Sequence, residues 1–308
     1  MPGTDEATKA ITAAVVDSFH DTPDSRLREL LQGLVRHLHG YVRELRPTIE
    51  EWEYAVDYLT AVGQKCDPTR QEFILLSDVL GVSMLVETLN EQASGTESTV
   101  LGPFHVVESP KRESGDNIDL MGTGTPCVVS LRVTSSDGSP LPGTSVDVWQ
   151  CSEDGFYDVQ QPDVQPLGNG RGLFRTDDDG RVWFRTIVPS HYPIPTDGPV
   201  GVLLDATERH PYRPAHIHFI VEAAGHRPLT THIFVADGPY LDSDAVFAVK
   251  KNLVVDFVQV DDAEQAREYQ VTAPFRAADF DIIVEPETTD PETTDPAAIE
   301  PETNKDAR

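Results

Sequence analysis

The first hundred residues carry the periodicity of amphipathic helices. Between Leu27 and Leu45, leucine and valine recur at intervals of three and four residues, and Pro47 ends the run. This spacing places the apolar side chains on one face of a helix. Such a face is usually covered by the core of the same chain, and it can also serve as a subunit interface.

Further helical segments follow this one. Thr48 and Glu51 have the spacing of a capping box, in which the two side chains satisfy free amide groups of the first turn. We therefore expect a second helix to begin there and to end near Gly63. A helical pattern then runs through residues 73–90, with Gly81 as the expected break.

Beyond Pro126 the pattern changes to alternating apolar and polar positions, whereas residues 91–125 show neither period and predict a linker. Short runs rich in β-branched residues are separated by turn segments such as SSDGSPLPG and TDDDG. The runs are CVVSLRVT, TSVDVWQ, GRVWFRTIV, AHIHFIVEA and LTTHIFV. They predict an antiparallel β-sandwich. The expected fold class is α+β, with a helical domain and the start of the linker over residues 1–105 and a sandwich over residues 106–284.

The composition narrows the range of partners. The chain has 52 acidic and 24 basic side chains and a formal net charge of −28, which excludes nucleic acid and anionic membrane surfaces on electrostatic grounds. Residues 285–308 repeat Pro, Glu, Thr and Asp and predict a disordered acidic tail. The three cysteines form no CxxC pair, and neither a signal peptide nor a membrane-length apolar stretch is evident. We therefore expect a cytoplasmic protein that is not inserted in a membrane.

Candidate chemistry begins with His216 and His218 in the run AHIHFIVEA. Successive side chains of a strand alternate between its faces, so two histidines two residues apart present their imidazoles on the same side. This is a geometry of metal sites, although the motif alone fits better two half-buried histidines that bond the backbone. Tyr157 and Tyr192 each lie in or beside a loop at the end of a strand, from which a side chain can reach the same site.

The two tyrosines affect which metal is expected. A phenol titrates at about pH 10, so it becomes an anionic ligand at neutral pH only against a strong Lewis acid. Two phenolates and two imidazoles suit ferric iron better than zinc or copper(I). Taken alone, each tyrosine is better explained as a core residue with a solvated hydroxyl.

The chain resembles the intradiol ring-cleavage dioxygenases throughout, apart from the tail. The segments that carry the resemblance are LLSDVLGVSMLVETLN, VLGPFHV, VDVWQCSEDGFYDVQ, HYPIPTDGPVG, YRPAHIHF and THIFVADGPYLDSDAVF. The resemblance implies one non-haem Fe(III) ion per subunit, held by Tyr157, Tyr192, His216 and His218. It also implies a homodimer formed through the helical domains, with a phospholipid in the tunnel between them.

The activity implied by the resemblance is cleavage of an aromatic diol or triol by O2 between two adjacent hydroxylated carbons. Tyr192 is implied to leave the iron when the diol binds and to accept one of its protons. Arg213 is implied to stabilise charge that develops on the ring, although in so acidic a chain it fits an ion pair as well. Catechol dioxygenases usually carry glutamine where this chain has His232, which either adjusts hydrogen bonding at the oxygen site or fills space.

The resemblance also implies hydroxyquinol (1,2,4-trihydroxybenzene) as the substrate and 3-hydroxy-cis,cis-muconate as the product, with catechol or chlorocatechol as alternative substrates. Asp78 is placed by the resemblance to accept a hydrogen bond from the third hydroxyl, and a site built for a hydroxyl discriminates against an analogue that lacks it. Asp78 alone equally fits a helix residue that bonds backbone or solvent. The residues expected to line the substrate pocket are Leu75, Asp78, Val100, Leu101, Gly102, Pro103, Phe104, Ile194, Pro195, Arg213 and Val246.

Two other classes of function remain open at this point. The sandwich segments also resemble transthyretin-like accessory modules, which share the fold and hold no iron, so the fold cannot separate the two. The set of four ligands can separate the two functions, because an accessory module has no need of a metal site. A zinc hydrolase would require a glutamate or a third histidine beside the His216–His218 pair, and we expect none there.

Overall fold

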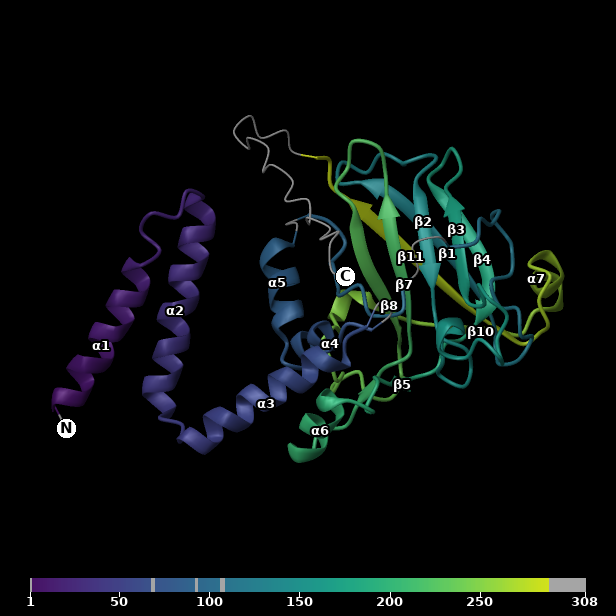
Figure 1. Cartoon of the computed structure of the whole chain (residues 1–308). Helices are drawn as coiled ribbons and strands as arrows, with labels where there is room; N and C mark the ends of the chain where they lie inside the picture. Colours follow the sequence, from purple (N-terminus) through teal and green to yellow (C-terminus); the bar gives the residue numbers. More distant parts are fainter. Residues whose placement is uncertain (1, 68–69, 92–93, 106–108, 288–308) are drawn as a thin grey trace, which may run out of the picture. The chain divides into compact units, whose positions relative to one another are not determined.

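The computed structural model describes residues 2–67, 70–91, 94–105 and 109–287. The chain divides into two compact units, residues 1–64 and residues 65–308 (Figure 1). The first unit is helical, and the second holds every strand that is described. None of the described helices is long and apolar enough to cross a membrane.

The first unit is made of three helices, α1 (Pro2–Asp17), α2 (Ser25–Leu45) and α3 (Ile49–Lys65). The capping box at the start of α3 is confirmed: the amide of Thr48 donates to Glu51 over 2.7 Å, and the amide of Glu51 donates to the Thr48 hydroxyl over 3.2 Å. α3 ends at Lys65, two residues beyond Gly63 and close to the expected end. A glycine inside a helix costs only about 1 kcal/mol relative to alanine, so it weakens the last turn without ending it.

Polar contacts join α1 to α2, whereas most of the apolar side chains of α2 are exposed. The Gln32 side chain donates to the Val16 carbonyl over 3.0 Å, and the Thr12 hydroxyl lies 3.0 Å from a ring nitrogen of His39. No residue of α2 is buried, and Leu34 exposes 60% of its surface. The predicted apolar face therefore exists, and this unit of the chain does not cover it.

The second unit contains the predicted sandwich. One sheet has the order β10–β11–β1–β4 and the other the order β3–β2–β7–β8–β9. Most neighbours are antiparallel, as expected, but β11 runs parallel to β1 and β9 runs parallel to β8, so both sheets are mixed. The bounds of the strands are β1 (Pro126–Ser135), β2 (Ser145–Trp149), β3 (Arg171–Arg175), β4 (Arg181–Ile187), β7 (His216–Glu222), β8 (Leu229–Val235), β9 (Val254–Val255), β10 (Val258–Val260) and β11 (Phe275–Val284).

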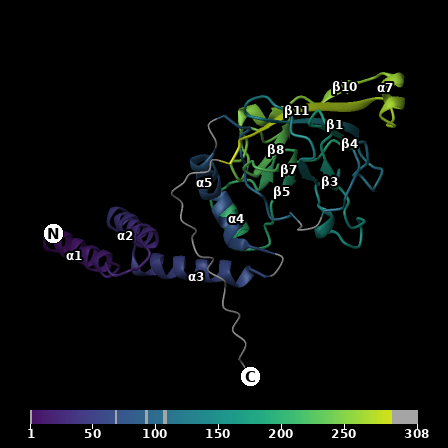
Figure 2. The same ribbon diagram turned by 90° about the horizontal axis from the view of Figure 1, so that it is seen from above.

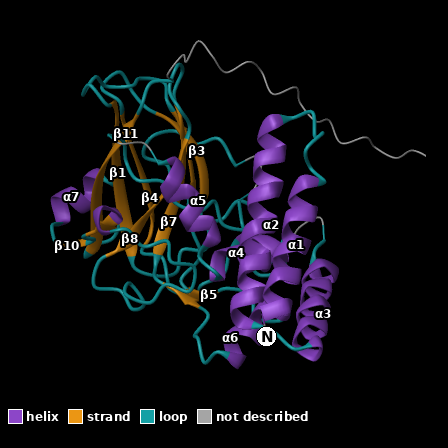
Figure 3. Cartoon of the chain, turned by 90° about the vertical axis from the view of Figure 1, so that its left-hand side faces the viewer, coloured by secondary structure: helices purple, strands orange, loops and turns teal. Residues whose placement is uncertain are grey.

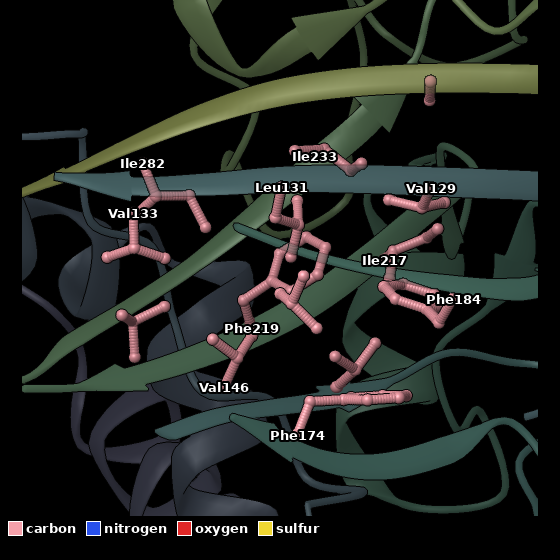
Figure 4. Close-up of a cluster of buried hydrophobic side chains, with 14 of the residues drawn as sticks. Val129, Leu131, Val133, Val146, Phe174, Phe184, Ile217, Phe219, Ile233 and Ile282 are labelled. Atoms are coloured by element: carbon pink, nitrogen blue, oxygen red, sulfur yellow. The ribbon is translucent and has the colours of Figure 1, made fainter. Parts of the chain in front are cut away.

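The core of the sandwich lies between the two sheets, where alternate side chains of each strand meet. Leu131 of β1 and Phe219 of β7 belong to the same cluster, together with Phe174, Phe184 and Ile217 (Figure 4). These side chains are almost wholly buried. The close packing gives a rigid support for the ends of the strands.

Short elements surround the sandwich (Figures 2 and 3). Gly81 separates α4 from α5 as predicted, with a left-handed φ of 71° that a glycine adopts without strain. α4 contacts α6, and β5 pairs with β6 in a small ribbon. The bounds of these elements are α4 (Glu72–Val79), α5 (Val82–Asn90), η1 (Asp158–Gln160), β5 (Tyr192–Pro193), α6 (Pro199–Ala206), β6 (Tyr212–Arg213), η2 (Lys251–Leu253) and α7 (Ala263–Glu268).

The described residues of the predicted linker contain no helix or named strand, and they bond to strands of both sheets. The amide of Thr99 donates to the Thr230 carbonyl, and the amide of Ile118 donates to the Arg185 carbonyl, each over 2.9 Å. After β11 the chain still bonds the body of the unit at Glu287, whose amide donates to the Gly225 carbonyl. The rest of the predicted tail, residues 288–308, lies outside the described residues.

Candidate metal centre

Four short segments of the second unit position the four predicted ligands. Tyr157 directly precedes η1, where its amide donates to the Gln160 side chain over 2.9 Å. Tyr192 begins β5 and is paired with Arg213 of β6. His216 and His218 lie two residues apart on β7, and the close approach of their Nε2 atoms shows that both rings lie on the same side of the strand.

The donor atoms of these side chains form a closed ring. The two tyrosine hydroxyl oxygens are 3.3 Å apart, and the Nε2 atoms of His216 and His218 are 3.0 Å apart. The Tyr192 oxygen lies 3.4 Å from Nε2 of His216, and the Tyr157 oxygen lies 3.1 Å from Nε2 of His218. Four donors that surround one point at these separations can bind one metal ion.

Burial keeps the imidazoles in the form that binds metals. It lowers the pKa of His216, with a further contribution from the Arg213 charge, and it lowers the pKa of His218, with contributions from its neighbouring histidines. Nδ1 of His216 lies 2.7 Å from the Pro214 carbonyl and can only donate to it, so the free electron pair is on Nε2. A backbone partner of this kind is typical of metal-binding histidines.

Burial has the opposite consequence for the two phenols. It raises the pKa of Tyr157, with further contributions from Tyr192 and Cys151, and it also raises the pKa of Tyr192, against the lowering effect of Arg213. Without a metal both phenols therefore keep their protons at neutral pH. Only a strongly polarising cation can convert them to phenolates, which restricts the ions that the full set of four ligands can hold.

A third histidine stands beside the pair, so the expectation that none would be there is wrong. His232 lies opposite His218 in the β7–β8 register, with ring centroids 4.0 Å apart. His216, His218 and His232 each offer a ring nitrogen, and these atoms lie within 4.8 Å of one another. Burial lowers the pKa of His232, as do the charges of His216 and Arg213, whereas the Val100 backbone acts in the other direction. The family resemblance had already placed His232 at the oxygen site, but nothing in the local sequence showed that it lies against the His216–His218 pair.

Arg213 is buried, and the ion pair that the sequence left open as its alternative role is present as well. Its Nε lies 3.2 Å from an oxygen of Asp244, while its Nη1 lies 3.2 Å from Nε2 of His216. Asp244 also accepts from the amides of Val246 and Ala248, so it is held firmly. Burial disfavours the Arg213 charge, but Asp244 and the two tyrosines outweigh it, and the pKa of Arg213 is raised.

Asp244 and Trp149 are two residues of the site that the sequence did not reveal. Trp149 stacks on His218, with ring centroids 4.5 Å apart and an interplanar angle of 13°. The β2–β7 register places the two residues opposite each other. Both belong to segments that carry the family resemblance, but their roles depend on neighbours that are distant in the sequence.

The residues expected to line the substrate pocket divide into two groups. Three of them lie at the metal centre: a Cβ at Gly102 would lie 3.1 Å from the His218 ring, Phe104 stacks on Tyr157, and Arg213 reaches His216. Asp78 on α4 is buried, and its charge interacts with Arg213 and Asp244. For the others the lining role stays a prediction. Leu75, Val100, Ile194 and Val246 are buried and Pro195 is partly buried, whereas Leu101 exposes 43% of its surface and Pro103 is also exposed.

Comparisons with known proteins cover most of the chain. Residues 24–97 match the family model of the catechol dioxygenase N terminus, and residues 101–286 match the dioxygenase model. The chain is 52% identical to a hydroxyquinol 1,2-dioxygenase of Rhizobium sp. over 82% of its own length and 87% of that protein. It is 48% identical to a 6-chlorohydroxyquinol 1,2-dioxygenase of Cupriavidus pinatubonensis, over 90% of its own length and 96% of that protein. Its structure is similar to the crystal structure of a hydroxyquinol 1,2-dioxygenase from Pseudomonas putida, with a TM-score of 0.86 and 47% sequence identity. The match covers 92% of this chain and 100% of the Pseudomonas chain.

Proposed function

Because the chain belongs to the intradiol ring-cleavage dioxygenase family, we propose that it cleaves hydroxyquinol with O2 between the two adjacent hydroxylated carbons. The product is 3-hydroxy-cis,cis-muconate. The chain is an oxidoreductase of the ring-cleavage type. The observation that carries the proposal is the closed ring of four buried donor atoms from Tyr157, Tyr192, His216 and His218.

The metal that fits these donors is ferric iron. Two phenols with raised pKa values require a highly charged, hard cation for ionisation, and two neutral imidazoles complete a mixed oxygen and nitrogen set. Ferric iron held by these four residues would accept electron density from a coordinated diol and so make its ring reactive toward O2. A transthyretin-like accessory module has no use for such a set, and a zinc hydrolase would leave both phenols without a role.

Tyr192 and Arg213 supply the proton and charge chemistry. Tyr192 would be a base in a dry site when it is ionised, and its oxygen could then accept a proton from a substrate hydroxyl. Arg213 lowers the pKa of Tyr192 against the larger effect of burial, so it stabilises negative charge at that position. Its pairing with Asp244 holds the guanidinium in place, and charge that develops on the ring beside it would be stabilised without reorganisation.

Asp78 supports hydroxyquinol as the substrate. It is 3% exposed, and its Oδ1 has no hydrogen-bond partner among the described residues. Burial raises the pKa of its carboxyl group and outweighs the lowering effects of Ser83 and Arg213. A substrate hydroxyl would satisfy this oxygen, whereas catechol, which lacks the third hydroxyl, would leave it unpaired at a cost of about 1–3 kcal/mol.

His232 is proposed to tune the oxygen-binding side of the site. It is fully buried and lies against both histidine ligands, with ring centroids 4.9 Å from His216 and 4.0 Å from His218. At that position it contacts the ligands without being required for the ring of four donors. Its lowered pKa keeps it uncharged, so it can accept or donate one hydrogen bond without adding positive charge.

The assembly proposed for the chain is a cytoplasmic homodimer formed through the helical unit, with a phospholipid between the two copies. The uncovered apolar residues of α2 support the interface, because a contiguous apolar face of this kind usually marks a contact. The three cysteines are free, which is consistent with a reducing compartment.

The decisive experiment is a visible absorption spectrum of the ferric protein, repeated after anaerobic addition of hydroxyquinol or of catechol. A tyrosinate-to-iron charge-transfer band that shifts on addition of hydroxyquinol would establish iron, tyrosine ligation and substrate coordination together. A protein that stays colourless after ferric reconstitution would reject the proposal.

A further inference from the structure

A buried ion pair lies next to the metal centre and takes no part in the chemistry described above. Arg171 of β3 and Asp158 of η1 each expose about 1% of their side chains. The Asp158 Oδ1 accepts a hydrogen bond from Nε of Arg171 over 2.7 Å and also lies 2.7 Å from Nη2. Water does not screen a pair buried this deeply, so its geometry is held tightly. Burying two charges also costs desolvation free energy, so the position of the pair beside a proposed metal ligand suggests a role other than stability.

One end of the pair holds the chain that carries Tyr157. Asp158 directly follows this tyrosine, and its second carboxylate oxygen accepts from the Gly168 amide over 2.8 Å. The carboxylate therefore joins both ends of the loop from residue 157 to residue 168. Because the backbone of Asp158 is fixed in this way, the direction in which the Tyr157 side chain leaves the backbone is fixed as well.

The other end of the pair holds the ring that packs on Tyr157. Nη2 of Arg171 donates to the backbone carbonyl of Phe104 over 2.8 Å. The Phe104 ring stacks on Tyr157, with centroids 4.8 Å apart and an interplanar angle of 27°. Gly102, two residues earlier, lies against the His218 ring. One guanidinium group thus connects the loop of a phenol ligand with the segment that contacts two ligands.

We infer that Arg171 and Asp158 are positioning residues that hold the Tyr157 phenol and the Phe104 wall in one relative placement. The inference rests on the proposed function for the identity of the metal and of the substrate. Arginine is required because its planar fork serves a carboxylate and a carbonyl at once, whereas the single ammonium of lysine cannot reach both with the same geometry. Phe104 is also an expected pocket residue, so the same contact links metal binding to substrate binding.

The test compares three forms of the full-length ferric protein: the wild type, Arg171→Lys and Arg185→Lys. Arg185 is the matched control, since it also donates to two backbone carbonyls, those of Gly115 and Gln270, and contacts no residue of the metal centre. For each form one measures the maximum of the tyrosinate-to-iron band, the ferric affinity by chelator competition, KM and kcat for hydroxyquinol, and the thermal midpoint.

Arg171→Lys is expected to displace the absorption maximum and to weaken ferric binding by about tenfold, the usual effect of losing a partner that orients a metal ligand. KM should rise more than kcat falls, because Phe104 loses its anchor while Arg213 and Tyr192 keep theirs. Asp158→Asn, which keeps the shape of the side chain and an acceptor for Gly168, should displace the band in the same direction. It serves as the decisive variant if Arg171→Lys does not fold.

The inference is overturned if the variants keep the wild-type band, ferric affinity and KM while losing only thermal stability, as Arg185→Lys is expected to do. In that outcome the pair merely stabilises the fold, and the proposed function stands. A wild type that shows no charge-transfer band after ferric loading would instead reject the proposed function, and this inference with it.

Discussion

The sandwich and the helical unit use their apolar residues in opposite ways. In the sandwich two sheets turn their apolar faces toward each other, and Leu131 and Phe219 are almost completely buried. In the helical unit α2 carries leucines at helical spacing, yet no residue of α2 is buried. The contrast shows that amphipathic spacing predicts which side chains share a face. It does not predict what covers that face, which requires a second apolar surface.

The same contrast explains why the metal centre lies in the sandwich. Neutral histidines and protonated phenols require a dry site, and the ends of β7 and β2 provide one because the strands are anchored in a packed core. An exposed helix face could present the same residue types, but water and side-chain motion would spread their donor atoms apart. The exposed face of the helical unit is therefore the proposed interface, and the sandwich holds the proposed metal centre.

The largest effect is expected when a proposed metal ligand of the sandwich is removed. Tyr157→Phe should lower ferric affinity and ring cleavage by more than about a hundredfold, because even an outer partner of a ligand is worth about 10- to 100-fold. Iron content and oxygen uptake measure the effect. Tyr54→Phe, at an exposed tyrosine of α3, is the matched control and should change neither. Full iron content and activity in Tyr157→Phe would show that the ligand assignment is wrong.

Truncation of core side chains tests the comparison through stability. Phe219→Ala should lower the free energy of unfolding of the sandwich by about 3–5 kcal/mol, because it removes a fully buried ring and leaves a cavity. Leu34→Ala, at an exposed position of α2, should cost well under half as much when measured at a concentration where the protein is monomeric. Denaturant unfolding gives both values, and equal losses would contradict the contrast between the two units.

A charge on the exposed face of α2 tests whether the helical unit forms the proposed dimer interface. Leu34→Glu should shift the protein from dimer to monomer in light scattering, because it would place an unpaired carboxylate in the proposed apolar interface. Arg36→Glu, also at an exposed position of α2, is the control and should leave the dimer intact. The sandwich should still bind iron in both variants. A Leu34→Glu protein that remains dimeric would place the interface elsewhere.

The smallest expected effect concerns substrate selection by Asp78. Asp78→Ala should reduce kcat/KM for hydroxyquinol about tenfold more than for catechol, since one buried hydrogen bond of about 1–3 kcal/mol is lost only with the triol. Asp78→Asn, which keeps an acceptor oxygen, should recover part of the difference. Equal losses for the two substrates would leave Asp78 a structural role alone.

Local patterns predicted the features that depend on a few neighbouring residues. The capping box at Thr48, the break at Gly81 and the shared direction of His216 and His218 are consequences of helix and strand geometry over one to four residues. The resemblance supplied Tyr157 and Tyr192 as further ligands. Their hydroxyl groups do lie at the histidine pair, within 3.4 Å of it.

Contacts that join distant segments could not be read in this way. His232, Trp149, Asp244 and Arg171 reach the site only through strand register and loop packing across separations of 14 to more than 60 residues. A shift of one residue in the β2–β7 or β7–β8 pairing would turn Trp149 or His232 to the opposite face without changing the local pattern. Hydrophobic spacing thus specifies the elements and their faces, whereas the neighbours of each buried polar group depend on how the packed sheets align.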